Sequence, residues 1–132
     1  GGPAAELRFS PSGIGFGQRD IREIQKAKAA VEVGVRAVLA EARIAPSDLR
    51  CVLLAGAFAR GLDLRNAQSI GLIPTVDQDR VVVAGNTALL GAGLCLDRNL
   101  VRSIRRSGRR VTLQHDGFAT RFADAVRLRP WG

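Results

Sequence analysis

The stretch Val52-Leu53-Leu54-Ala55-Gly56-Ala57-Phe58-Ala59-Arg60 decides how this chain is expected to fold. An apolar run reaches a glycine set among small residues, and polar, turn-prone sequence follows. This pattern is typical of a buried strand that ends at the carboxyl edge of a parallel sheet, where ligands bind in open α/β folds. Because Gly56 and Ala57 carry almost no side chain, a flat ligand could lie against their backbone. A tight turn from strand to helix explains the same pattern without a ligand.

A similar unit follows about thirty residues later. Val81-Val82-Val83-Ala84 is a second short apolar run, and it breaks at Gly85-Asn86 before a helical pattern. Neither run alternates with polar residues, so we expect two adjacent parallel strands with both faces covered. Asn86 is a good N-cap for the following helix. Gly91 and Gly93 lower helix propensity, which predicts close packing of that helix on the sheet or near a ligand.

Composition places the chain among single-domain proteins. The 132 residues are 46% hydrophobic, and we expect one domain over 1–132, with 1–5 as linker or vector sequence. No segment is long and apolar enough to span a membrane. Cys51 and Cys95 are predicted to be inert buried thiols in a reducing compartment, hence a cytoplasmic protein, rather than a disulfide or metal site. His115 is the only histidine, which excludes a multi-histidine metal site.

The positive charge is concentrated near the carboxyl end. Residues 1–94 hold eleven Lys/Arg against nine Asp/Glu, a net charge of +2, whereas 95–132 hold nine against three, a net charge of +6. On a helix, one face would carry Arg98, Arg102, Arg105, Arg106 and Arg109, opposite Leu100, Val101 and Ile104. Such a face is either solvated or binds an acidic protein, for which Arg102, Arg105 and Arg106 are the candidates. Nucleic acid is disfavoured, because no aromatic residues are interleaved with the arginines.

The remaining pattern predicts a hairpin, then helix, strand, helix, strand, helix, and a helical appendage over 98–132. The expected elements are strands at Glu6–Ser10, Ile14–Gly17, 51–55, 81–84 and Val111–Leu113, and helices at about 19–43, 64–70, 86–94, 98–107 and 117–126. The helix at 64–70 should begin at Asp63 as N-cap and end at Gly71.

One lysine lies within an apolar stripe of the long helix. The stripe recurs at spacings of three and four residues and comprises Ile21, Ile24, Lys28, Val31, Val35, Val38 and Ala42. A lysine can extend from the edge of such a stripe to water. Alternatively, Gln25 and Lys28 point into a cleft that holds an anionic ligand, because buried lysines are rare unless paired.

Four segments, in this order, resemble the carboxyl-terminal domain of the corrinoid activation proteins, the ATP-dependent reductive activators of corrinoid methyltransferase systems. The segments are Gln18–Ala30 at the start of the long helix, Leu54-Ala55-Gly56-Ala57-Phe58, Asn66-Ala67 with Ile70-Gly71-Leu72-Ile73-Pro74, and Gly85-Asn86 with Gly91-Ala92. Phe118 and Phe122 lie where the closing helix of that family has Phe residues. The resemblance covers about residues 14–126.

The resemblance implies an α/β fold, namely part of a ribonuclease H-like (actin-like ATPase) lobe of the acetate and sugar kinase, Hsp70 and actin superfamily. In that lobe Glu6–Ser10 and Ile14–Gly17 would be the second and third strands, and the central first strand is missing from this sequence. We therefore expect no intact five-stranded sheet. We expect one of three repairs in its place. Either the hairpin pairs directly with strand 51–55, or residues 111–113 fill the gap, or a second copy of the chain donates a strand and forms a dimer.

The resemblance also implies a function for the longer protein, the reduction of Co(II) corrinoid to Co(I) on a partner protein, driven by ATP with Mg²⁺. Electrons would come from a 2Fe–2S cluster on an amino-terminal ferredoxin domain of the same chain. Gly56, Ala57 and Phe58 correspond to the adenosine-contacting motif, with Ala57 in place of the usual second glycine. We add Gln25 and Lys28 to the predicted nucleotide site.

Missing motifs limit what this segment can do alone. The sequence has no ferredoxin cysteines, no Asp-x-Gly-Thr phosphate loop and no carboxylate pair placed to hold Mg²⁺. We therefore expect no catalytic residue, no metal site and no cofactor bound by this segment alone. Two alternatives stay open: an interaction module that docks an acidic partner through the arginine helix, and a fragment of a sugar or metabolite kinase of the same superfamily.

Overall fold

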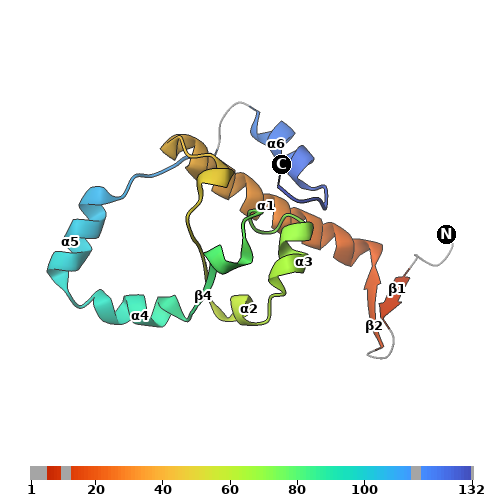
Figure 1. Ribbon diagram of the computed structural model, residues 1–132, viewed down its shortest axis with the longest axis horizontal. Coiled ribbons are helices and arrows are strands. Elements are labelled where there is room, and N and C mark those ends of the chain that lie inside the picture. Colours follow the sequence, from red (N-terminus) through yellow and green to blue (C-terminus); the bar gives the residue numbers. More distant parts are fainter. Residues whose placement is uncertain (1–5, 10–12, 114–116, 132) are drawn as a thin grey trace.

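The computed structural model describes residues 6–9, 13–113 and 117–131 (Figure 1). Their elements are β1 (Glu6–Phe9), β2 (Ile14–Gly17), α1 (Gln18–Ala42), β3 (Val52–Ala55), α2 (Ala57–Arg60), α3 (Leu64–Ser69), β4 (Val81–Gly85), α4 (Thr87–Leu94), α5 (Arg98–Ser107) and α6 (Phe118–Ala125), with 3-10 turns at Pro46–Asp48 and Gln78–Arg80. This order confirms the predicted α/β fold. Helix α2 was not predicted, and the strand predicted at Val111–Leu113 is wrong, because that segment forms no strand and pairs with none of the described strands.

The four strands form two separate pairs. β1 and β2 are antiparallel, whereas β3 and β4 are parallel, with Val52 opposite Val81 and Leu54 opposite Val83. The parallel pair confirms the prediction for strands 51–55 and 81–84. Figure 1 shows the hairpin apart from β4, at the far end of α1. Neither the hairpin nor residues 111–113 pairs with β3, so these two predicted repairs of the missing central strand are wrong.

Helix α1 is the longest element, and its buried stripe shares only Lys28 with the one predicted. The Gly17 backbone N–H donates to the Asp20 carboxylate at 2.8 Å at its start, and Arg43 closes its end with a left-handed φ of 56°. Its buried residues are Lys28, Ala29, Glu32, Val33 and Leu39. Ile24, Val31 and Val38 of the predicted stripe are exposed, because the part of the chain described here places no element over them.

The best-packed part of the molecule lies between α1 and α6. Ala29, Val33 and Ala125 form its buried centre, and Phe122 and Val126 pack against it. The Phe118 and Phe122 rings stack with centroids 5.9 Å apart. In Figure 1, α6 follows the upper side of α1, so elements nearly a hundred residues apart form one layer.

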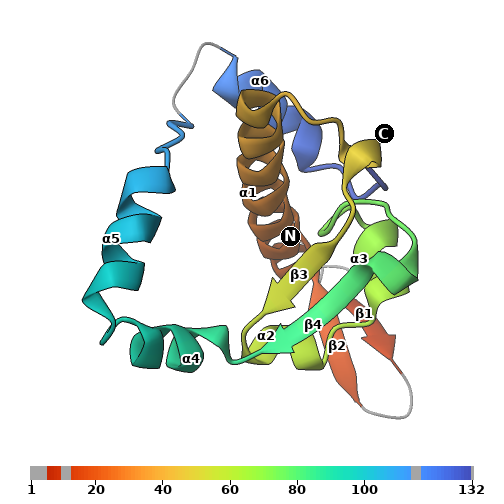
Figure 2. The same ribbon diagram turned by 60° about the vertical axis from the view of Figure 1, so that its left-hand side comes forward.

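Helices α4 and α5 form an arm that leaves β4 and turns back toward the end of α1 (Figures 1 and 2). Asn86 and Asp97 cap the two helices as their side chains accept backbone N–H bonds. Neither helix contains a buried residue. Apart from the chain neighbours and the backbone of α4 itself, nothing described lies within 4 Å of where a Cβ would stand at Gly91 or Gly93, so the described elements do not pack closely on this helix as predicted.

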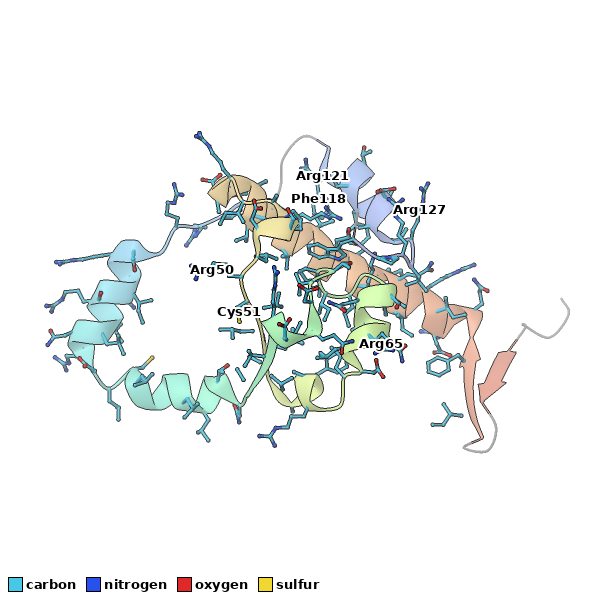
Figure 3. The ribbon with its side chains drawn as sticks, viewed as in Figure 1. Arg50, Cys51, Arg65, Phe118, Arg121 and Arg127 are labelled. Carbon is cyan, nitrogen blue, oxygen red and sulfur yellow. The ribbon has the colours of Figure 1, made fainter. Side chains whose placement is uncertain are left out.

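The strand pair and the cysteines are also more open than predicted. Leu53 and Val82 are exposed on one face of the pair, whereas Val81 is buried and Val52 and Leu54 are half-buried on the other, so the described elements cover only one face, and that one in part. Cys51 and Cys95 are free and exposed, which corrects the prediction of buried thiols (Cys51 is labelled in Figure 3). Both cysteines were predicted to be buried from apolar neighbours in sequence, and those neighbours lie on the same uncovered surfaces.

Candidate functional site

The two parallel strands end side by side at glycines that hold left-handed backbone conformations. Gly56 has φ 94° and Gly85 has φ 70°. The Gly56 N–H donates to the Gly85 carbonyl at 2.7 Å, which joins the two strand ends. A residue with a Cβ is strained at such φ values, so the sequence needs glycine at both positions.

The surface at the end of β3 is uncovered among the described residues. Apart from its two chain neighbours, no described residue comes within 4 Å of where a Cβ would stand at Gly56. Ala57 is exposed, and the Phe58 ring is 75% exposed. An exposed aromatic ring beside bare backbone offers a planar apolar surface that an aromatic ligand can contact. The geometry therefore suits the flat ligand predicted from the sequence, although it also suits an apolar protein partner.

Arg60 is a candidate site residue that the sequence analysis missed. It ends α2, and its Nη2 lies 3.7 Å from where a Cβ would stand at Gly85. No carboxylate pairs with this guanidinium among the described residues. An uncommitted guanidinium close to two bare backbone turns can bind an anionic group. Its position four residues after Gly56, at the end of the turn, was the signal available in the sequence.

Lys28 and Gln25 are placed differently from one another. Gln25 is half-buried on α1. Lys28 is only 1% exposed, and its ammonium donates to Glu32 at 2.6 Å and to the carbonyls of Ala125 and Arg127, both at 2.8 Å. Since an ammonium has three N–H donors, these bonds leave none for a ligand. The assignment of Lys28 to a nucleotide stays a prediction, and its contacts in this structure oppose it.

The arginines of α5 lie on an exposed helix, as predicted. Arg102 and Arg106 line a shallow groove of about 460 Å³ together with Asn99, Ser103 and Ser107. Arg105 is exposed outside this groove. Arg109 lies beyond the end of the helix and approaches Glu41 to 3.8 Å, so the prediction that it continues the helical face is wrong.

A larger pocket of about 950 Å³ lies between α1 and α6. Val33, Ala37 and Ala125 contribute apolar surface, and charged side chains surround it. Arg36 pairs with Glu32 at 2.8 Å and Arg129 with Asp124 at 2.6 Å, so much of this charge is neutralised within the chain. The pocket includes none of the residues at the end of β3.

The described part of the chain contains neither a metal-binding cluster nor a membrane-spanning helix. No group of three or more His, Cys, Asp or Glu residues could hold a metal ion within residues 6–9, 13–113 and 117–131. None of the described helices has the length and apolar character to cross a membrane. His115 lies outside the described residues.

Comparison with known proteins supports the resemblance seen in the sequence. A family model described as the C-terminal domain of RACo, the ASKHA domain, matches residues 4–129. The corrinoid activation enzyme RamQ of Eubacterium limosum is 42% identical over 79 residues, which cover 60% of this chain and 13% of that protein. The Co(II) methylated amine-specific corrinoid protein reductase of Methanosarcina barkeri is 27% identical over 119 residues, 89% of this chain and 22% of that protein.

A solved structure has the same fold. The structure titled as a reductive activator for a corrinoid, iron-sulfur protein matches with a TM-score of 0.76 at 30% identity, over 87% of this chain and 19% of that one. The chain thus spans only 13% and 22% of the length of the two curated relatives.

Proposed function

The chain belongs to the family of the C-terminal domain of RACo, the ASKHA domain, and from this membership we propose that it forms part of an ATP-dependent reductive activator of corrinoid proteins. The longer protein transfers one electron to a Co(II) corrinoid bound on a partner protein and so forms Co(I). The observation that supports this most strongly is the family match over residues 4–129, nearly the whole chain. The two relatives, a corrinoid activation enzyme and a reductase of a corrinoid protein, point the same way.

Within that protein, we assign this chain the wall that contacts the adenosine of ATP. The adenine lies against the backbone of Gly56 and Ala57, with the Phe58 ring beside it. The support for this assignment is the open space at Gly56 and the exposed ring of Phe58. A base with two π-faces gains most from a flat apolar surface of this kind. Gln25 is kept as a hydrogen-bonding candidate on α1.

Arg60 adds a charged contact to this wall. Its guanidinium lies beside Gly85 without a carboxylate partner among the described residues, so it is available to a phosphate oxygen of the nucleotide. Arginine binds phosphate with two parallel N–H bonds, which fixes orientation as well as adding affinity.

The remaining machinery must come from the rest of the longer protein. No described carboxylate cluster fits Mg²⁺, and the two cysteines of the chain are too few for the four ligands of a 2Fe–2S cluster. A 2Fe–2S cluster on an amino-terminal ferredoxin domain would supply single electrons. This chain would contribute nucleotide binding and a surface for the corrinoid protein.

ATP binding by the longer protein tests the wall. Calorimetry should show that Arg60→Gln weakens ATP affinity about tenfold, since hydrogen bonds to charged groups are worth roughly 1.5–3 kcal/mol. Arg65→Gln is the matched control, because Arg65 is an exposed arginine on α3 (Figure 3). The reduction of Co(II) corrinoid, followed by absorbance, should fall in parallel. A wild-type protein that binds no ATP, or equal effects of both variants, would contradict the proposal.

The α5 arginines support a second function, protein docking. Arg102, Arg105 and Arg106 are exposed on a helix with no buried residue, so an acidic protein surface can reach them. The corrinoid protein itself is the partner proposed for this surface. The third alternative, a sugar or metabolite kinase, shares only the superfamily fold, and no particular observation favours it.

A further inference from the structure

The last described residues of the chain form a strap that ties three parts of the molecule together. We define the strap as residues 126–131, which follow α6 and end at Trp131. The Trp131 indole N–H donates to the Gly71 carbonyl at 2.8 Å, and Trp131 is only 7% exposed. The Thr75 hydroxyl adds a longer bond, at 3.5 Å, to the Trp131 carbonyl. The strap therefore holds the loop between α3 and β4 from one side.

From the other side, the strap is held by a row of charges on α1. Lys28 donates to the carbonyls of Ala125 and Arg127, and its partner Glu32 also accepts from Arg36 at 2.8 Å. The Arg36 guanidinium lies over the Trp131 ring, 4.7 Å from its centre. Residues 28, 32 and 36 are one helical turn apart, so a single face of α1 carries the whole row. No buried side-chain polar atom lacks a hydrogen bond in the described part of the chain.

The loop, the strap and Lys28 meet at Gly71. This residue has φ 75°, and a Cβ built there would overlap the Arg129 carbonyl oxygen and lie 2.9 Å from the Lys28 Cε. The overlapping atom belongs to the backbone, which cannot turn aside as a side chain can. Glycine is thus required both for the turn after α3 and for the close approach of the strap.

The position of this junction gives it a consequence for the strand pair. Helix α1 packs mainly on β2 and α6, whereas β3 and β4 pack on each other and on α2. No extensive packing between elements of these two groups is found among the described residues. The loop that starts at Gly71 leads into β4, and β4 ends at Gly85, which bonds to Gly56. The strap therefore connects α1 to the loop that leads into the strands carrying the adenosine wall.

We infer that Lys28 and Trp131 are positioning residues, which act through the strap to hold the β3–β4 pair in a fixed position relative to α1, in the arrangement that ATP requires. This inference rests on the proposed function for its ligand. It assigns a role to the buried Lys28 that does not involve contact with the nucleotide. By reciprocity, ATP bound at the wall must favour the closed strap by the same factor by which the closed strap favours ATP.

Hydrogen exchange of the longer protein, read on peptides that cover 70–77 and 126–131, tests the strap directly. Trp131→Phe keeps a ring for Arg36 and loses only the N–H bond to Gly71. One such hydrogen bond typically changes the equilibrium between closed and open strap by a factor of about 2 to 10. Exchange in both peptides should rise by about this factor, and ATP affinity by calorimetry should fall by a similar one. In the wild-type protein, ATP should slow exchange in both peptides, which a merely structural strap would not show.

A pair of glycine variants provides the matched control. Gly71→Ala should open the strap and weaken ATP binding more than Trp131→Phe does, because its Cβ overlaps backbone. Gly34→Ala, on α1 with no described atom within 4 Å of its Cβ position, should change neither exchange nor affinity.

The outcomes separate the strap from the function on which it rests. Strap opening with ATP affinity unchanged would overturn the positioning role. Faster exchange in 126–131 alone, with 70–77 unchanged, would overturn the strap as a connection. If the wild-type protein binds no ATP, the proposed function and the positioning role both fail. Even then, hydrogen exchange tests the strap itself: in Trp131→Phe, exchange should rise in both 70–77 and 126–131 if the strap connects them.

Discussion

Among individual residues, the buried ion pair of Lys28 and Glu32 on α1 is the most consequential. Burying an ammonium costs several kcal/mol unless its donors are all satisfied. Lys28 meets this condition with one carboxylate and two carbonyls that lie at the end of α6, where the helix dipole favours a positive charge. Glu32 is shared with Arg36, so the negative charge is also compensated. This buried cluster of charges is therefore stable only when Lys28, Glu32 and Arg36 are all present.

Removing the lysine should destabilise the fold far more than removing a surface lysine of the same helix. We expect Lys28→Met to lower the free energy of unfolding by about 3–5 kcal/mol, since Glu32 then loses a buried partner. Lys26→Met is the control, because Lys26 is 61% exposed in its pair with Glu23 and should cost less than about 1 kcal/mol. Denaturant titration measures both. Equal losses would show that Lys28 is not an anchor.

Gly56 offers a second test at this scale. Gly56→Val should abolish ATP binding by the longer protein and lower its stability by about 1–3 kcal/mol, because a β-branched residue is strained at φ 94° and its side chain covers the ligand face. Gly61→Val is the control, since Gly61 has φ −98° and open space around it. Calorimetry and thermal unfolding read the two effects separately. Unchanged affinity in a folded Gly56→Val protein would remove Gly56 from the site.

At the scale of elements, local signals were enough to predict most boundaries. Asp63 and Asn86 cap their helices as predicted, because an N-cap depends on a side chain and a backbone N–H three residues away. Helix α2 was missed because four residues after a glycine carry no periodicity. The predicted stripe of α1 was right at Lys28 but displaced elsewhere, because the buried stripe also contains Glu32, which a hydrophobic pattern counts as exposed.

The site was less predictable than the fold. Gly56, Ala57 and Phe58 are adjacent in sequence, so one motif could indicate them. The contacts of Lys28 depend on carbonyls 97 and 99 residues away, and no local pattern contains them. Arg60 approaches Gly85 only because β3 and β4 are parallel neighbours. Side chains whose role depends on pairing across the fold are therefore the ones that sequence reasoning misplaces.

Helix α5 permits a test by charge reversal. Changing Arg102, Arg105 and Arg106 to glutamate should leave the fold intact, since exposed substitutions shift stability by no more than about 0.5 kcal/mol each. If α5 docks an acidic corrinoid protein, the variant should bind it more weakly. Wild-type binding should also weaken with salt, because exposed charges are screened beyond about 10 Å at 0.1 M. Light scattering or calorimetry measures this affinity. An affinity that changes neither with the substitutions nor with salt would mean that the arginines are only solvated.

On the scale of the whole molecule, the chain leaves much apolar surface uncovered. Leu53 on β3, Phe58 on α2 and Leu89, Leu90 and Leu94 on α4 are all more than half exposed. The buried apolar cluster of the described residues lies on α1 and α6, with single buried residues elsewhere. Exposed apolar surface of this extent indicates contact with other polypeptide. The chain spans only a small part of its relatives' length, so we expect the rest of the longer protein to cover this surface.

The outer edge of β3 leads to the last prediction. β3 is hydrogen-bonded on one side only within the described residues, so a row of its backbone groups faces outward. Unpaired strand edges recruit strands from other chains. Two of the three repairs predicted for the missing central strand are wrong, so the third is expected. The 132-residue chain on its own should form a dimer, with twice the chain mass by size-exclusion chromatography with light scattering.

Two leucine variants tell which surface joins the copies. Leu53→Lys places a charge on the β3 edge strand and should shift the dimer to monomer. Leu96→Lys changes a residue that is 87% exposed and lies after α4, away from any strand, so the dimer should persist. The reverse result would assign association to the arm rather than to the strand edge. A wild-type chain that stays monomeric at all concentrations would mean that β3 remains an open edge until the rest of the protein supplies its neighbour.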